Sequence, residues 1–224
     1  MYKACVLGLT LVAAAASVAA QDLQVNVRTS GAQANPAVAA DPAGGSLIVW
    51  SSYFTTAGRS NDILARRLDP TGAFVGSEFA VNTSPEGNQT EPAVAMNRRG
   101  EFVIVWQGPG LDQEEIFLRR FHANGVPATN DLLVNLTTAG RQLYPNVALS
   151  EAGVVIVVWE SRVTTLDSDT MQACAQLFDP NGAGLGEEII LDDPLSDCRY
   201  PDVAVDRSGR FVVTWLRGFT SLSG

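Results

Sequence analysis

The sequence predicts an all-β protein built from a repeated four-stranded antiparallel unit. One stretch of fifteen residues occurs four times, beginning at Pro36, Pro92, Pro145 and Pro201, so the period is 53 to 56 residues. Each copy ends in tryptophan, and these are the four tryptophans of the chain. Beyond residue 20, no segment has sustained helical periodicity, whereas short apolar runs and turn residues recur throughout.

The first two strands expected in each unit form a hairpin. A Pro-x-Val-Ala segment makes the first strand, and an apolar run that ends at tryptophan makes the second, as in "FVIVW" (102–106). Between them come an Asp, Asn or Ser and then a glycine. These residues are typical of hairpin turns because they bond to their own backbone and supply positive φ. The turn glycines are Gly44, Gly100, Gly153 and Gly209.

Two further strands complete each unit. Copies of the third strand with its turn are "ILARRLDPTG" (63–72), "IFLRRFHANG" (116–125) and "ACAQLFDPNG" (173–182). Copies of the fourth are "LQVN" (23–26), "FAVN" (79–82), "LLVN" (132–135) and, more loosely, "IILD" (189–192). The unit that begins at Pro201 contains only the first two strands. The sequence therefore predicts three full units plus a partial fourth.

The second strand of each unit indicates how the units are arranged. "FVIVW" and "VVIVVW" are apolar on both faces, whereas an antiparallel strand with one wet face alternates apolar and polar residues. In a β-propeller, small radial sheets pack face to face, so their inner strands are buried on both sides. We therefore expect a β-propeller-like array, either open or incomplete. An immunoglobulin-type sandwich and a solenoid are the alternatives.

The tryptophans are expected to fill the gaps between successive units, because burying such large rings is strongly stabilising. Their constant position relative to the strand favours this structural role. The functional alternative is a row of aromatic platforms that stack on sugar rings. The four residues are Trp50, Trp106, Trp159 and Trp215.

The pattern Pro-x-Val-Ala, Gly, Phe-Val-Val-x-Trp, Ile-x-Ala-Arg-x-Phe-Asp-x-x-Gly, Phe-x-Val-Asn-Thr resembles repeats of roughly 50 residues in secreted and surface-attached bacterial proteins. It covers residues 22–217. The resemblance implies propeller-like β domains used as scaffold, adhesion or binding modules, and no particular activity. The Asp-box of sialidases is superficially similar, but Asp41 and Trp50 are farther apart than in that motif. No sialidase residue is therefore carried over.

The N-terminal segment predicts export. Lys3 precedes an apolar run that ends in small residues, the order found in a secretory signal peptide. This run is shorter than the roughly twenty residues that a membrane-spanning helix needs. We expect a signal peptide at 1–20 and a single repeat domain at 21–224. The expected location is secreted, cell-surface or periplasmic, and the mature chain is not expected to span a membrane.

Acidic residues dominate the charge of the chain, whose formal net charge is −9. Nucleic acid and anionic membrane surfaces favour basic patches, so neither is an expected partner. Arg66, Arg67, Arg119 and Arg120 repeat at equivalent strand positions and are interpreted as a solvated or ion-paired face.

The partial fourth unit has two interpretations. The chain is the front part of a longer repeat protein, or "LQVN" (23–26) completes the last sheet and closes a four-bladed ring. In the first case an open sheet edge is exposed, and self-association through that edge is expected.

Two cysteines depart from the repeat. Cys174 stands where other copies have Leu64 and Phe117, and Cys198 stands where they have Gln33, Gln89 and Gln142. Both replacements are expected near one rim of the same unit, and exported proteins favour oxidised cysteines. We expect a disulfide between them. Two unpaired small residues are the alternative.

No catalytic constellation is expected. The single histidine, His122, stands where Asp69 and Asp179 occur in other copies, so it is interpreted as a turn residue. This excludes a triad that relies on histidine, and too few His and Cys residues remain for a zinc site. No cofactor is expected.

The loops after the tryptophans differ most between copies, and we expect any binding site there. Tyr53 and Phe54 are candidates for stacking on a glycan. Acidic loop residues are candidates for Ca²⁺ ligands, although their spacing matches no known calcium loop and a solvated loop is favoured. These acidic residues are Asp112, Glu114, Glu115, Asp167 and Asp169.

The sequence thus predicts an exported, non-enzymatic scaffold or binding module for a surface polymer, a glycan or a protein. One alternative is a carbohydrate-active hydrolase or lyase on a propeller scaffold, which needs converging carboxylates. The other alternative is a truncated fragment of a larger surface protein.

Overall fold

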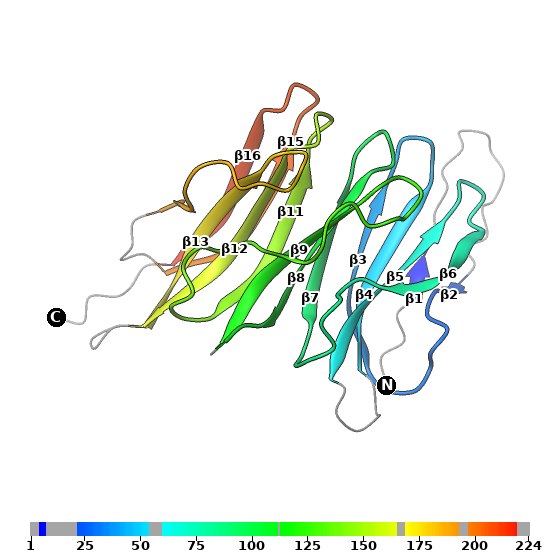
Figure 1. Ribbon diagram of the computed structural model, residues 1–224, viewed down its shortest axis with the longest axis horizontal. Coiled ribbons are helices and arrows are strands. Elements are labelled where there is room, and N and C mark those ends of the chain that lie inside the picture. Colours follow the sequence, from blue (N-terminus) through cyan, green and yellow to red (C-terminus); the bar gives the residue numbers. More distant parts are fainter. Residues whose placement is uncertain are drawn as a thin grey trace.

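The computed structural model describes residues 5–7, 22–53, 60–111, 113–164, 169–192 and 197–218. These residues form strands and turns without a helix, and therefore without a helix suited to crossing a membrane. The strands after β2 form four sheets that stand side by side in a row (Figure 1). We number these sheets as blades 1 to 4 in chain order. The predicted all-β fold of repeated antiparallel sheets is confirmed.

Blades 1 to 3 each contain four antiparallel strands in chain order, and blade 4 contains two. Blade 1 contains β3 (Gln33–Ala40), β4 (Ser46–Tyr53), β5 (Asn61–Leu68) and β6 (Phe74–Ala80). Blade 2 contains β7 (Thr90–Met96), β8 (Phe102–Pro109), β9 (Glu114–Phe121) and β10 (Leu132–Leu133). Blade 3 contains β11 (Gln142–Leu149), β12 (Val155–Thr164), β13 (Asp169–Phe178) and β14 (Ile189–Ile190). Blade 4 contains β15 (Asp197–Val205) and β16 (Phe211–Gly218).

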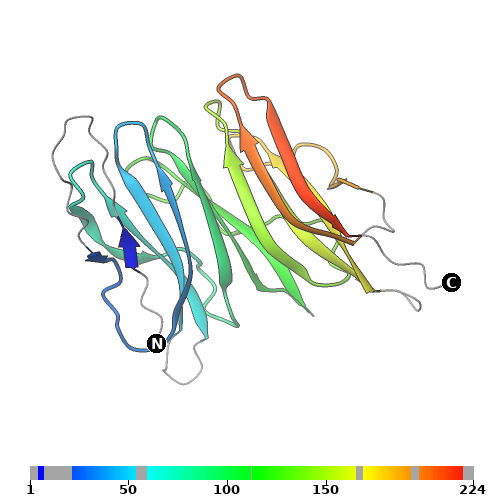
Figure 2. The same cartoon turned by 180° about the vertical axis from the view of Figure 1, so that it is seen from behind.

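The N-terminal strand does not complete blade 4. Instead, β2 (Asp22–Gln24) pairs with β1 (Cys5–Leu7), and blades 1 and 4 lie at opposite ends of the row (Figures 1 and 2). Within the described residues the array is therefore open rather than a closed ring, and β16 pairs only with β15. Self-association through this edge stays a prediction, as do the signal peptide, in which β1 lies, and the domain boundaries.

Segment 23–26 occupies the place of an outer strand in front of blade 1. Val25 is buried and packs with Ile48 and Trp50. The carbonyl oxygen of Val25 accepts a hydrogen bond of 2.6 Å from Nη1 of Arg66. The equivalent contact in the next blade joins Nη1 of Arg119 to the Val81 oxygen over 2.7 Å. Val81 directly follows the outer strand of blade 1, so the two segments have the same structural role.

These contacts correct part of the interpretation of the repeated arginines as a solvated or ion-paired face; Arg119 does form an ion pair, with its Nε 3.7 Å from Oδ1 of Asp131. Arg66 and Arg119 each donate to a backbone oxygen of the preceding segment, and Arg120 is buried with Nη1 donating to the Asp179 oxygen over 3.2 Å. The long side chains bridge neighbouring blades, and their guanidinium groups satisfy carbonyl oxygens that no ladder reaches.

The hairpin turns have the geometry that their glycines require. The φ of the four turn glycines lies between 76° and 96°, a region that residues with a Cβ rarely adopt. In blade 1, the N–H of Gly44 donates to the Asp41 oxygen over 3.0 Å, and Oδ1 of Asp41 accepts from the N–H of Ala43 over 2.7 Å. His122 lies in a turn of blade 2, where its oxygen accepts from the N–H of Gly125 over 2.8 Å.

The first strand of each blade (β3, β7, β11 and β15), which we call the innermost strand, has a bulge immediately before its proline. The ladder register shifts there in all four blades, because proline has no N–H with which to continue the ladder. The residue before the proline adopts a left-handed φ of 50° to 53°. Such a conformation costs about 1–3 kcal/mol for a residue with a side chain. These residues are Asn35, Glu91, Tyr144 and Tyr200.

Side chains along each second strand alternate between the two neighbouring blades. In blade 2, Ile104 and Trp106 face blade 1 and pack with Leu47 and Val49, whereas Val105 faces blade 3. Both sets are buried. The core is therefore a series of layers between blades, which explains why this strand is apolar on both faces. In blades 1 to 3 the tryptophan is at most 1% exposed and lies on the side of the preceding segment.

A buried hydrogen bond fixes each of these three tryptophans. The indole Nε1 donates to Oε1 of a glutamine that lies 17 residues earlier in the same blade, over 2.8 to 2.9 Å. The pairs are Trp50–Gln33, Trp106–Gln89 and Trp159–Gln142. The repeated glutamine is thus the acceptor that the buried indole needs.

In blade 4 the indole N–H of the tryptophan has a different acceptor. Cys198 occupies the glutamine position, and the Trp215 indole instead donates to Oδ2 of Asp192 over 2.9 Å. The Cys198 thiol donates to the same oxygen over 3.4 Å. Asp192 follows the outer strand of blade 3, so this acceptor comes from the neighbouring blade.

The predicted disulfide is wrong, because Cys174 and Cys198 are both free. Cys174 faces blade 2 in the layer that contains Trp159, whereas its neighbour Ala175 faces blade 4. Cys198 lies in blade 4. The sheet of blade 3 therefore separates the two sulfur atoms. The sequence correctly placed both cysteines near one rim, but the alternation of side chains along the strands puts the two thiols on opposite faces of the blade 3 sheet.

Removing the glutamine acceptor should destabilise the fold. Gln142→Leu leaves the Trp159 indole N–H buried without an acceptor, so the free energy of unfolding should fall by about 1–3 kcal/mol in urea titrations. Gln113→Leu alters an exposed glutamine and should change it by about 0.5 kcal/mol or less. Equal effects of the two substitutions would contradict this role.

The two thiols should be unreactive in the folded protein. Burial raises the pKa of Cys174 to about 12 and that of Cys198 to about 11, which suppresses the reactive thiolate. Protein purified under oxidising conditions should react slowly with a thiol reagent near neutral pH. After denaturation without reductant, both residues should become labelled in a peptide map. A disulfide-linked peptide pair in that map would refute the assignment.

Candidate functional site

The two ends of the blades differ. One end contains the short turns within each hairpin and between the third and fourth strands. The other end contains the loops that follow each tryptophan strand and the connections between blades, and we call it the loop rim. Cavities of about 480, 490 and 240 Å³ lie on the loop rim. The variable end of the array thus contains cavities formed by described residues of three blades.

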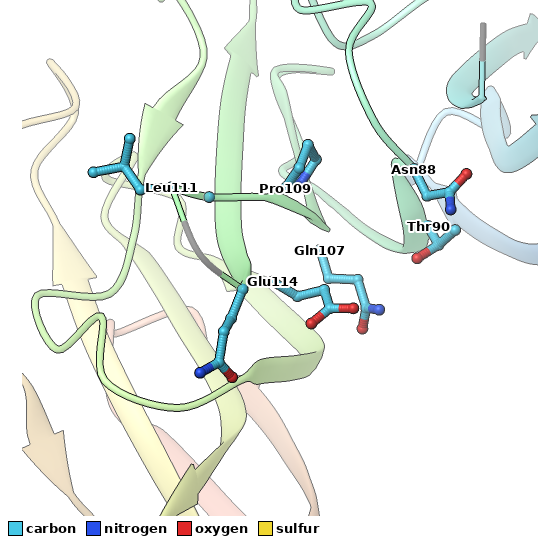
Figure 3. Close-up of a pocket in the computed structure, with 8 residues that line it drawn as sticks. Asn88, Thr90, Gln107, Pro109, Leu111 and Glu114 are labelled. Carbon is cyan, nitrogen blue, oxygen red and sulfur yellow. The ribbon is translucent and has the colours of Figure 1, made fainter. Parts of the chain in front are cut away.

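The first cavity lies on blade 2 (Figure 3). Glu114 contributes to its wall and forms a two-point ion pair with Arg141, with Nε to Oε2 at 2.7 Å and Nη2 to Oε1 at 2.9 Å. Hydrogen bonds from Arg141 lower the pKa of Glu114. The labelled lining residues are Asn88, Thr90, Gln107, Pro109, Leu111 and Glu114.

The second cavity lies between blades 2 and 3, beside the first. Gln113 contributes to both walls, and the wall of the second cavity also includes Arg141, directly before β11, and Arg162 on the adjacent β12 of blade 3. Arg162 also contributes to the third cavity. The three hollows therefore form a continuous series along the loop rim from blade 2 to blade 4.

The third cavity lies between blades 3 and 4, and a buried glutamate adjoins it. Its wall is formed by Leu143, Tyr144, Arg162, Met171 and Arg199. Glu160 follows Trp159 on β12 and is the ladder partner of Leu143, so both side chains project from the same face of the sheet. Glu160 is 1% exposed.

The carboxyl group of Glu160 has one hydrogen bond. Oε1 accepts from the N–H of Tyr200 over 2.7 Å, whereas Oε2 has no hydrogen-bond partner within the described residues. Burial raises the pKa of Glu160, and the charge of Asp197 acts in the same direction. The tyrosine N–H and the charge of Arg199 oppose this shift. Protonated Glu160 is thus favoured more than in an ordinary exposed glutamate.

Asp197 has a different environment from Glu160. Its Oδ1 accepts from the N–H of Met171 over 3.1 Å, and its Oδ2 accepts from Nε of Arg199 over 3.1 Å. Glu160 is thus buried with a raised pKa, whereas Asp197 is partly exposed and accepts two hydrogen bonds. Carboxyl groups in contrasting environments divide acid and base roles in enzymes.

The neighbouring blade shows what Glu160 replaces. At the equivalent position in blade 2, Oε1 of Gln107 accepts from the N–H of Tyr144 over 3.3 Å. A neutral amide therefore provides the same link between blades. The carboxyl group at position 160 adds an ionisable proton, which this link does not require.

The sequence-based candidates for a binding site are not brought together. Tyr53 is 44% exposed at the end of β4 on blade 1. Phe54, Asp112 and Asp167 lie outside the described residues, and Asp169 begins β13.

Glu114 and Glu115 have separate environments. Glu114 binds Arg141 at the surface, whereas Glu115 is buried, accepts from Nδ2 of Asn135 and has its pKa raised by burial. The described residues contain no group of three or more His, Cys, Asp or Glu side chains suited to a metal ion. Calcium binding therefore stays a prediction.

Sequence reasoning missed Glu160, Asp197, Tyr144 and Tyr200. A signal for the first was present, because the residue after the tryptophan is Ser51, Gln107 or Leu216 in the other copies and is acidic only at 160. The two tyrosines also stand at equivalent positions, immediately before Pro145 and Pro201. The sequence does not group these residues, because their shared location depends on the stacking of blades 3 and 4.

No family model and no curated protein sequence matches this chain. Solved structures do resemble it. An endo-arabinase from Bacteroides thetaiotaomicron superposes with a TM-score of 0.54 at 16% identity, covering 88% of this chain and 76% of that one. A protein of unknown function from Dyadobacter fermentans gives 0.59 at 9% identity, covering 84% and 63%. The Hadza microbial sialidase Hz136 gives 0.53 at 11% identity, covering 77% and 39%.

These similarities extend the fold prediction and correct the functional one. At such low identities they show the fold, and this chain spans less than two thirds of the length of the second and third structures. The expectation of a non-enzymatic scaffold or binding module is nevertheless overturned, because structures of this architecture include an endo-arabinase and a sialidase.

The raised pKa of Glu160 should make stability depend on pH. The pKa of Glu160 is higher in the folded protein than in the unfolded chain. The stability that protonated Glu160 contributes is therefore complete at pH values below its unfolded-state pKa, and it is lost as the pH rises through its folded-state pKa. Glu160→Gln should remove this loss. The free energy of unfolding of the variant relative to wild type should therefore increase from about pH 4 to about pH 8.

The matched control is Glu86→Gln, which alters an exposed carboxylate on the same end of blade 2. The increase with pH should be larger for Glu160→Gln than for this control. An increase for Glu160→Gln no larger than that of the control would show that Glu160 titrates as an ordinary glutamate.

Proposed function

We propose that this chain is a carbohydrate-active hydrolase whose reaction takes place on the loop rim between blades 3 and 4. The observation that carries the proposal is the buried carboxyl group of Glu160, whose pKa is raised by burial and by the charge of Asp197, next to a cavity of about 240 Å³. The similarity of the fold to an endo-arabinase and a sialidase supports a carbohydrate as the substrate.

Glycoside hydrolysis needs one carboxylic acid and one carboxylate. Glu160 is the acid: its Oε2, which has no described partner, delivers a proton to the oxygen of the leaving sugar. Because Glu160 is almost wholly buried, this step requires a local rearrangement of the cavity wall when substrate enters.

Asp197 is the second carboxyl group. The N–H of Met171 and Nε of Arg199 orient its two oxygens. As a carboxylate it either attacks the sugar carbon or activates a water molecule, depending on its separation from Glu160 in the substrate complex. The export predicted from residues 1–20 would bring such an enzyme to polysaccharides outside the cytoplasm.

The test is release of reducing sugar from linear arabinan and from a sialylated oligosaccharide by the full chain. Glu160→Gln should lower kcat by at least about 100-fold, because the amide cannot donate the catalytic proton. Asp197→Asn should have a comparable effect. The fold should persist in Glu160→Gln, since Gln107 makes the equivalent link in blade 2.

Glu114→Gln serves as the control, since it alters a rim carboxylate that binds Arg141 away from the third cavity. It should retain most of the activity. Activity that persists in Glu160→Gln would overturn the assignment, and absence of sugar release from every substrate would overturn the proposed function.

A further inference from the structure

Two exposed tyrosines occupy equivalent positions in blades 3 and 4. Tyr144 and Tyr200 immediately precede the prolines of β11 and β15, and they are 47% and 69% exposed. Tyr144 contributes to the wall of the third cavity. Arg199, next to Tyr200 in the chain, contributes to the same wall. Tyr144 therefore borders the cavity that adjoins Glu160, and Tyr200 directly follows another residue of its wall.

The backbone of both tyrosines is fixed. Their φ values are 51° and 53°, in the left-handed region. The N–H of Tyr144 donates to Oε1 of Gln107 over 3.3 Å, and that of Tyr200 donates to Oε1 of Glu160 over 2.7 Å. Each acceptor belongs to the preceding blade. Stacking of the blades thus holds each tyrosine in place before any ligand arrives, which lowers the entropy cost of binding.

The fold itself gives no reason for tyrosine at these positions. A left-handed φ is tolerated by asparagine and is unfavourable for a bulky residue. Blade 1 indeed has Asn35 there, and its Nδ2 donates to Oε1 of Glu91, the equivalent residue of blade 2, over 2.7 Å. Strained residues that their surroundings hold in place concentrate at ligand sites. Blades 3 and 4 thus present aromatic rings where blades 1 and 2 have a polar pair.

We propose that Tyr144 and Tyr200 form a stacking platform that binds consecutive parts of an oligosaccharide chain and directs it into the third cavity. The inference rests on the proposed function and names the binding site for its substrate. An aromatic ring offers an apolar face and a polar hydroxyl, which suits the apolar face and hydroxyl edge of a sugar.

Packed sheets lie about 10 Å apart, so a ligand that contacts both rings is longer than one sugar residue. The platform therefore selects a chain of sugars over a monosaccharide. Binding at Tyr200 also places the chain beside Glu160, because the carboxyl group and the tyrosine backbone are directly hydrogen-bonded.

The experiment uses the full chain carrying Glu160→Gln, so that binding is measured without hydrolysis. Its affinity for linear arabino-oligosaccharides and for oligomers of sialic acid is determined by calorimetry. Adding Tyr144→Asn or Tyr200→Asn should weaken binding of the recognised oligosaccharide by about 2- to 10-fold each. Adding Tyr144→Phe or Tyr200→Phe should preserve most of the affinity, because the ring remains.

Asparagine is chosen because Asn35 adopts the same φ in blade 1, so the fold should tolerate it. Phe211→Ala, at an exposed aromatic residue at the start of β16 and at the end of blade 4 opposite the loop rim, is the matched control and should leave the affinity unchanged. Thermal unfolding identifies any variant whose weaker binding reflects misfolding. The monosaccharides should bind at least about 10-fold more weakly than their oligomers.

The two proposals can fail separately. If oligosaccharides bind with unchanged affinity after both Tyr→Asn substitutions, or if none of them binds, the platform is wrong even where Glu160-dependent hydrolysis occurs. If binding depends on the tyrosines but wild-type protein releases no sugar, the platform stands and the hydrolase is wrong.

Discussion

The buried hydrogen bond between tryptophan and glutamine is the interaction on which the blades depend. The indole must lie between two sheets to exclude water, and its N–H then needs an acceptor inside the layer. In blades 1 to 3, Oε1 of the glutamine 17 residues earlier provides it, which ties the start of the innermost strand to the end of the next one. One bond thus fixes the ladder of the hairpin and the position of the ring that packs on the preceding segment.

This arrangement also determines where chemistry can occur. Because the tryptophan faces the preceding blade, the next residue along the strand points toward the following blade and emerges at the loop rim. In blade 2 this residue is Gln107, and in blade 3 it is Glu160, and both reach the backbone of the next innermost strand. A position that links two blades therefore carries an amide in blade 2 and an ionisable carboxyl group in blade 3.

The fold could be predicted from the sequence because local patterns of residues specify each blade. The period, the turn glycines such as Gly100 and the apolar runs each depend on neighbours within one unit. The site depends on contacts between units, and the repeat in the sequence does not reveal these contacts. Glu160 acquires its burial from blade 4, Cys174 and Cys198 are divided by the sheet of blade 3, and the arginines reach carbonyl oxygens of another blade. The loop rim could be predicted from its variability, whereas the carboxyl pair required the stacking of particular blades.

Blade 4 differs from the others in one respect that concerns how the array assembles. Each earlier hairpin contains both its indole donor and its acceptor, so it can complete this bond from its own residues. Trp215 obtains its acceptor from Asp192, outside its hairpin. The last hairpin can therefore reach its final packing only once the preceding sheet has formed. The cavity beside Glu160, whose wall draws residues from both blades, likewise requires blades 3 and 4 to be packed together.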